Sequence, residues 1–300
     1  MGRRKKGRDV TGWLVIDKPA GPTSTAVVTI VRRTLDARKA GHAGTLDPAA
    51  TGVLAIALGE ATKTVPLVTD GDKDYRFTVR WGAETATDDA EGEVLRRSDS
   101  RPGRDAVDAA LGAFRGDILQ VPPQVSAVKI DGARAYDLAR DGETFEIAAR
   151  PLHVADLTLE DMPDADHAVF RMTCGRGGYV RSIARDLGRA LGCLGHVATL
   201  RRLATGPFDV ADAVPLAEIE GRPADEVEAR LLPIEAALSD VAEARVGEIA
   251  ATRIRNGNPG EVLTTDAGFG ETAWASRDGR AIALGRYRAG HFHPDRVFVT

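Results

Sequence analysis

One carboxylate lies in the middle of a glycine-rich stretch. Asp47 is the only acidic residue within residues 41–54, and Pro48 follows it directly. Gly41 and Gly44 can adopt backbone angles that are closed to other residues, and they let a ligand approach the main chain. Pro48 disfavours the α region for Asp47, so we expect this acid on a bent or extended segment. A carboxylate held on a loop could act as a nucleophile, or as a general acid or base.

The dipeptide Asp47-Pro48 also fits a purely structural role, because Asp is a common N-cap and Pro a common first residue of a helix. After Gly52, the short apolar run at 53–58 predicts a buried strand. Such a strand would hold the acid-bearing loop against a rigid element, which is where binding and catalysis usually occur.

A second stretch carries arginines at helical spacing. Apolar residues recur at i, i+3, i+4 and i+7 from Val180 to Leu187, which predicts an amphipathic helix. Arg181 and Arg185 would then lie on one face of this helix, one turn apart. From the pattern alone they fit two surface arginines.

Other stretches predict the elements that must position these residues. Residues 75–81 alternate apolar and polar side chains, which predicts a strand with one buried face. Residues 13–17 predict another strand, and Thr23-Ser24 predicts the start of a helix. The acidic residues 84–100 are typical of turns, and residues 105–114 of a short helix.

Several strings resemble the TruB family of pseudouridine synthases. GHAGTLDPAATGVL at 41–54, followed by LGEATK, is similar to the catalytic motif of that family. Four more segments also resemble it: DKPAGPTS at 17–24, QVPPQVSAVK at 120–129, residues 174–188, and GHVATLRRL at 195–203 with TGPF at 205–208. The family isomerises a uridine in the T-loop of tRNA, conventionally position 55, and uses no cofactor.

The resemblance implies an α+β fold with a pseudouridine-synthase-type mixed or antiparallel sheet and flanking helices. It also implies a small β-rich, PUA-like C-terminal domain that contacts RNA. We therefore expect a basic, disordered tail at 1–11, a catalytic domain at 12–236 and a PUA-like RNA-binding domain at 241–300.

The resemblance also implies roles for single residues. Asp47 matches the catalytic carboxylate, Arg181 the arginine that pairs with it and holds it ionised, and Tyr75 a tyrosine placed against the target base. The implied substrate-binding residues are Lys18, His42 (which fills the space that the base vacates), Lys129, Tyr179 and Leu200. Where the family commonly has Gly-Thr-Tyr, this chain has Gly177-Gly178-Tyr179 and lacks the threonine hydroxyl.

The residue patterns alone leave plainer roles open for some of these positions. Tyr75 and Leu200 also fit an ordinary core, and His42 and Lys129 also fit solvent-exposed positions. Pseudouridine formation breaks a C–N bond, turns the uracil and forms a C–C bond, so the base must leave its stack to react. The sequence leaves open whether a carboxylate would attack the base or the sugar, or take a sugar proton.

Two other functions also stay open at this point. A glycosidase-like hydrolase would cleave a related bond but usually needs a second carboxylate, for which Asp17 and Asp70 are candidates. An RNA-binding or tRNA-folding protein without turnover would keep the same surface. The presence of Asp47, Tyr75 and Arg181 together favours catalysis.

The composition fits a globular enzyme of the cytoplasm that needs no cofactor or metal. The chain has 300 residues and a net charge of −4, with basic residues clustered locally, as at 3–6, 32–33 and 201–202. Cys174 and Cys193 have no disulfide or metal spacing, which is typical of a reducing compartment. There is no dinucleotide or P-loop motif and no apolar run of membrane-spanning length. The expected partner is the T-stem-loop of tRNA, and we expect a monomer without an obligate protein partner.

Overall fold

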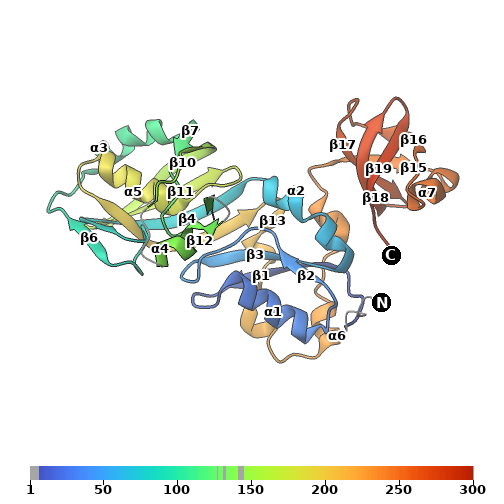
Figure 1. Ribbon diagram of the computed structural model, residues 1–300, viewed down its shortest axis with the longest axis horizontal. Helices are drawn as coiled ribbons and strands as arrows, with labels where there is room; N and C mark the ends of the chain where they lie inside the picture. The colour runs from blue at the N-terminus through green and yellow to red at the C-terminus, as the bar shows by residue number, and fades with distance from the viewer. Residues whose placement is uncertain (1–6, 127, 131–132, 141–144, 300) are drawn as a thin grey trace.

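The computed structural model describes residues 7–126, 128–130, 133–140 and 145–299. A large mixed sheet with flanking helices forms one part, and a small closed barrel forms the C-terminal part (Figure 1). The predicted α+β class, the mixed sheet and the β-rich C-terminal part are confirmed.

The large sheet has ten strands. Eight follow the order β14-β1-β3-β12-β4-β11-β10-β7, while β2 pairs with β3 and β13 pairs with β12. The β1–β14 and β3–β12 pairs are parallel, and the other pairs are antiparallel. The strands are β1 (Gly12–Lys18), β2 (Ala40–His42), β3 (Thr51–Leu58), β4 (Lys73–Trp81), β7 (Gly116–Gln120), β10 (Arg150–Asp164), β11 (His167–Cys174), β12 (Gly195–Thr205), β13 (Phe208–Asp209) and β14 (Val214–Pro215).

Local sequence signals explain the central elements. In β4 every second side chain from Lys73 to Trp81 is buried, as the alternation of polar and apolar residues predicts. The helix α1 (Ser24–Thr34) begins at the predicted cap, where the Thr23 hydroxyl accepts a hydrogen bond from Ala26 N at 3.1 Å. The other helices are α2 (Val65–Asp70), α3 (Arg104–Ala110), α4 (Ala135–Arg140), α5 (Val180–Ala190), α6 (Ala224–Glu228) and α7 (Glu248–Arg255). None of these described helices has the length and hydrophobicity needed to cross a bilayer.

Two stretches differ from the sequence-based expectation. The predicted turns at 84–100 include a hairpin of β5 (Ala83–Thr85) and β6 (Val94–Arg97). The predicted tail at 1–11 lies outside the described residues up to residue 6. From residue 7 onward the chain contacts the rest of the fold, since Arg8 N donates to Asp36 O at 2.6 Å.

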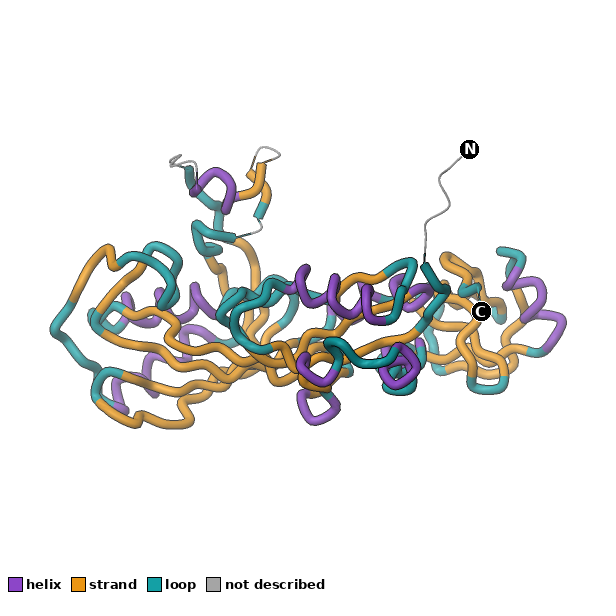
Figure 2. The backbone as a smooth tube through the Cα atoms, turned by 90° about the horizontal axis from the view of Figure 1, so that it is seen from below, coloured by secondary structure: helices purple, strands orange, loops and turns teal. Residues whose placement is uncertain are grey.

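The C-terminal barrel consists of β15 (Ala242–Val246), β16 (Gly260–Thr265), β17 (Thr272–Arg277), β18 (Arg280–Arg288) and β19 (His291–Val297). Its contacts with the part built on the large sheet include Lys63 Nζ, which donates to Val297 O at 2.6 Å, and Glu235 Oε1, which accepts from Ala281 N at 2.6 Å. A separate hairpin of β8 (Lys129–Ile130) and β9 (Ala133–Arg134), followed by α4, stands away from the large sheet in Figure 2.

Candidate active site

Asp47 lies on the loop that joins β2 to β3. Its backbone is outside any helix, and Ala50 N closes a turn onto Asp47 O at 3.1 Å. The predicted bent segment is therefore present, and Asp47 does not cap a helix. Of the two glycines singled out before it, Gly44 adopts a φ of +98°, whereas Gly41 lies in strand β2 without a left-handed backbone.

Lys18, the last residue of β1, binds backbone carbonyl groups of this loop. Its side chain is fully buried, and Nζ donates to Pro19 O and Pro48 O at 2.9 Å and to Ala50 O at 2.8 Å. Burial lowers the pKa of Lys18, and the charge of Asp47 offsets part of that shift. Substrate binding by Lys18 stays a prediction; in the structure three backbone carbonyls bind its ammonium group, which the solvent does not reach.

Arg202 supports the same loop from strand β12. Its guanidinium donates to Val53 O at 2.8 Å, to Gly44 O at 3.1 Å and to Thr45 O at 3.4 Å, and the residue is 1% exposed. In the sequence this arginine stands out only as part of the basic cluster at 201–202. Its neighbours along the chain gave no signal that it would bind a loop more than 140 residues away.

Ser24 fixes the residue directly before the acid. Its buried hydroxyl accepts from Leu46 N at 2.9 Å and donates to Leu46 O at 3.0 Å. In the family that the sequence resembles, the segment corresponding to residues 17–24 supports this loop, so the resemblance implied such a contact, whereas the residue pattern alone predicted only a helix start at Ser24. Together Lys18, Arg202 and Ser24 hold the backbone on both sides of Asp47.

Arg181, on helix α5, contacts the carboxylate itself. Its Nε lies 2.9 Å from Asp47 Oδ2, and Nη2 lies 3.4 Å from Asp47 Oδ1. The remaining nitrogen, Nη1, donates to Thr87 O at 2.9 Å and to Val125 O at 3.1 Å. Arg181 and Arg185 are both buried, so they are not the surface arginines that the helical pattern alone would fit.

Asp47 faces a cleft with a volume of about 1110 Å³. Six of the eight residues singled out from the sequence line it, namely Asp47, Arg181, Tyr75, His42, Tyr179 and Leu200. Lys18 lies beneath the loop, and Lys129 lies in β8, where its side chain is outside the described part of the structure. Asp47 is the only carboxylate among the described residues that line the cleft. Nowhere in the described part of the chain do three His, Cys, Asp or Glu side chains form a metal-binding group.

Tyr75 and His42 are both held in an uncharged form by their surroundings. Tyr75 is 8% exposed and lies directly opposite Arg202 across β4 and β12. Burial raises the pKa of Tyr75, and the Arg202 charge opposes that shift only in part. Burial lowers the pKa of His42, and the charge of Arg202 lowers it further. An uncharged ring can stack on a base, and no charged group has to leave water for it to do so.

The Gly-Gly-Tyr segment before helix α5 is closely packed. A Cβ at Gly178 would lie 2.6 Å from Cys174 Sγ, so this backbone has no room for the threonine that the family commonly has. Tyr179 is fixed through its main chain: its N–H donates to Gln120 Oε1 at 2.9 Å, and its carbonyl accepts from Gln120 Nε2 at 3.1 Å.

The fold is similar to folds already known from solved structures. A chain in the solved structure of an H/ACA ribonucleoprotein bound to a substrate RNA containing 2'-deoxyuridine superposes with a TM-score of 0.76. The two chains are 21% identical, and the match covers 100% of this chain and 92% of the other. At this identity the match establishes the fold.

Sequence comparisons give the family. The model described as TruB family pseudouridylate synthase, N-terminal domain, matches residues 32–180. The model described as tRNA pseudouridylate synthase B, C-terminal domain, matches residues 181–239. The chain belongs to the TruB family of pseudouridylate synthases.

Full-length relatives agree with this assignment. A protein of Dinoroseobacter shibae named tRNA pseudouridine synthase B is 63% identical, over 99% of this chain and 98% of the relative. A protein of a Ruegeria species with the same name is 61% identical, over 99% of both chains. The alignments therefore extend through the C-terminal barrel, which lies beyond both family models.

Proposed function

We propose that this chain converts a uridine in the T-loop of tRNA, conventionally position 55, to pseudouridine, with Asp47 as the catalytic carboxylate. The substrate is inferred from relatives named tRNA pseudouridine synthase B. The observation that carries the catalytic role is the pairing of Asp47 with buried Arg181 at the wall of the cleft.

The reaction is balanced without a co-reactant. The bond between the ribose C1' and uracil N1 breaks, the uracil turns, and C1' bonds to C5. The proton on C5 leaves, and N1 gains one. Asp47 would serve as the nucleophile, or as the base that takes a sugar proton, and Arg181 would hold the carboxylate in one direction.

The target base would be flipped out of the RNA into the cleft. Tyr75 would stack against it, beside Leu200, and His42 would fill the space that the base leaves. Tyr179, which lines the cleft, and Lys129 would contact the RNA. These roles follow the family resemblance and the positions of the described side chains at the cleft.

A hydrolase with two carboxylates is less well supported. Asp17, one candidate for the second acid, is held by two hydrogen bonds from Arg201, at 3.0 and 2.8 Å. Asp70, the other candidate, is paired with Arg176 at 2.8 Å. Neither lines the cleft that holds Asp47.

The proposal also covers the C-terminal barrel, the oligomeric state and the cellular compartment. The C-terminal barrel would act as a PUA-like RNA-binding domain, and the enzyme would work as a monomer in the cytoplasm. Cys174 and Cys193, both free and buried, fit a reducing compartment.

The test uses a tRNA transcript that carries tritium at uridine C5, with wild type and Asp47→Asn. We expect wild type alone to release tritium, from one T-loop uridine, while both proteins bind the transcript. Binding without release by wild type would favour a tRNA-folding protein, and free uracil among the products would favour a hydrolase. Release by Asp47→Asn at the wild-type rate would reject Asp47 as the catalytic residue.

A further inference from the structure

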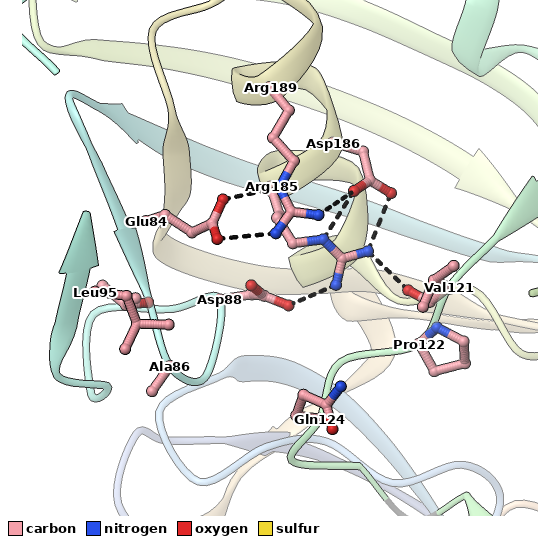
Figure 3. A pocket seen from close by; sticks show the side chains of 11 residues that line it. Glu84, Ala86, Asp88, Leu95, Val121, Pro122, Gln124, Arg185, Asp186 and Arg189 are labelled. Atoms are coloured by element: carbon pink, nitrogen blue, oxygen red, sulfur yellow. Dashed lines mark hydrogen bonds and ion pairs between the residues drawn. The ribbon is translucent and has the colours of Figure 1, made fainter. Parts of the chain in front are cut away.

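Three arginines on one face of α5 contact a single segment of the chain. Arg181, Arg185 and Arg189 are spaced four residues apart, and all three contact residues 84–88. Arg185 and Arg189 line a cavity of about 230 Å³ together with Glu84 and Asp88 (Figure 3). Arg189 binds Glu84 through two hydrogen bonds of 2.8 Å. Arg185 Nη1 lies 2.9 Å from Asp88 Oδ2. Arg181 donates to Thr87 O at 2.9 Å.

The middle contact is the most buried of the three. Asp88 and Arg185 are each 6% exposed, and Arg185 also binds Asp186 and Val121 O, at 2.8 Å each (Figure 3). Asp88 adopts a φ of +60°, a left-handed conformation that aspartate and asparagine tolerate better than other residues with a Cβ. Its surroundings hold this conformation: Val197 N donates to Asp88 O at 3.0 Å, and the carboxylate pairs with Arg185.

This conformation has a consequence for Arg181. The chain turns at Asp88 in such a way that the Thr87 carbonyl and the Asp88 carboxylate both reach α5, one helical turn apart. Asp47 binds one side of the Arg181 guanidinium, through Nε and Nη2, and Thr87 O binds the other, through Nη1. If Asp88 moved, the Thr87 carbonyl would move with it, and Arg181 would lose a contact that sets its direction.

We propose that Asp88 is a positioning residue for the reaction: its pair with Arg185 keeps the Thr87 carbonyl on Arg181 and thereby holds Asp47 in its reactive direction. This inference rests on the proposed catalytic role of Asp47. Neither the sequence motifs nor the comparisons assign a role to Asp88 or Arg185.

The proposed effect of Asp88 on the reaction depends on pH, because only the ionised carboxylate attracts Arg185 by its charge. Burial raises the pKa of Asp88 to about 6, although the Arg185 charge and hydrogen bond, with the charges of Arg181 and Arg189, oppose that shift. The other charged or titratable groups around it are Glu84 and Asp89 on its own segment, Asp186 on α5, and His196 on β12. As the pH falls through 6, Asp88 gains a proton and its charge attraction to Arg185 is lost.

The test is Asp88→Asn, because asparagine keeps the shape of the side chain and tolerates the left-handed backbone. We expect its single-turnover rate constant on tRNA to be about tenfold below wild type near pH 7.5, with the dissociation constant for tRNA changed less than about twofold. Near pH 5 the two rate constants should converge, since wild-type Asp88 is then also uncharged. Comparing the two proteins at each pH cancels the titration of His42.

Two further variants make the test specific. Asp186→Asn removes the other carboxylate that binds Arg185 but has no contact with Thr87, so it should stay within about twofold of wild type. Arg185→Lys tests the pair from the other side and should lower the rate constant near pH 7.5. A rate ratio near one at pH 7.5, or a loss that is equal at every pH, would overturn the inference. Either result, with Asp47→Asn inactive, would leave the proposed function intact.

Discussion

One edge of the Arg181 guanidinium contacts both carboxylate oxygens of Asp47, with Nε 2.9 Å from Oδ2 and Nη2 3.4 Å from Oδ1. The arginine side chain is 7% exposed, whereas that of the aspartate is 39% exposed. The cation has therefore already lost its water in the free enzyme, and the carboxylate remains open to the cleft. This asymmetry suits an acid that must meet a substrate in a fixed direction.

Arg181→Lys should cost catalysis even though the positive charge is kept. A lysine ammonium cannot contact both oxygens of Asp47 and also donate to Thr87 O, so the direction of the carboxylate is no longer fixed. We expect a single-turnover rate on tRNA lower by about ten- to a hundredfold. Arg171→Lys is the matched control, because Arg171 binds Asp74 in a similar way but is 53% exposed. Wild-type rates for Arg181→Lys would argue against the ion pair as a catalytic element.

Lys18→Met should destabilise the protein. It removes the ammonium that three carbonyls share, and the buried Ala50 O loses the donor that Lys18 supplies, whereas Pro48 O keeps its hydrogen bond from Gly21 N. The expected loss of unfolding free energy is at least about 2 kcal/mol, measured by urea denaturation. The exposed Lys39 provides the comparison, since Lys39→Met should change stability by less than about 0.5 kcal/mol. Equal stability of the two variants would mean that Lys18 does not support the loop.

Gly52→Ala should be far more harmful than Gly41→Ala. A Cβ at Gly52 would lie 2.1 Å from Arg202 O, and the φ of Gly52 is +98°, so both space and conformation exclude alanine. A Cβ at Gly41 would have no heavy atom within 4 Å. We expect a loss of about 3 kcal/mol or more at Gly52 and less than about 1 kcal/mol at Gly41, from thermal or urea unfolding. A similar loss at both positions would contradict the described packing of the loop on β12.

We expect Asp88 to increase the unfolding free energy of the protein as the pH falls from 7.5 to 5. Its pKa is raised to about 6 in the folded protein, above its value in the unfolded chain. Its contribution to the unfolding free energy is thus fully present below the unfolded-state pKa and is lost as the pH rises through 6. Relative to Asp88→Asn, wild type should gain about 1.4 kcal/mol between pH 7.5 and pH 5. Urea unfolding of both proteins at the two pH values measures this gain, and a difference of the opposite sign would reject the raised pKa.

Local periodicity predicted the elements well. The alternation in β4 and the apolar face of α5 are signals between close neighbours in the chain, and both elements lie where the pattern placed them. The loop that carries Asp47 was likewise predicted from its glycines and proline. These features depend only on residues that are close together in the chain.

The supports of the site could not be predicted in this way. Lys18, Arg202 and Ser24 bind loop residues that are 22 to 158 positions away, and Asp88 pairs with Arg185 across 97 positions. Such pairs depend on the order of strands in the sheet, which the local pattern does not contain. The local pattern therefore did not predict that strand β1 brings the Lys18 ammonium to these carbonyls.

The cationic groups of Lys18 and Arg202 both lie against the loop that carries Asp47. In the described part of the chain, carbonyl oxygens of this loop bind both groups. Carbonyl dipoles solvate a positive charge without cancelling it, so the electric field of both cations extends into the cleft. Mobile ions of the solvent cannot approach these buried groups and screen them less than they screen surface lysines. A chain with a net charge of −4 can in this way attract a phosphate backbone to one place, and part of that attraction should persist at salt concentrations that weaken ordinary surface contacts.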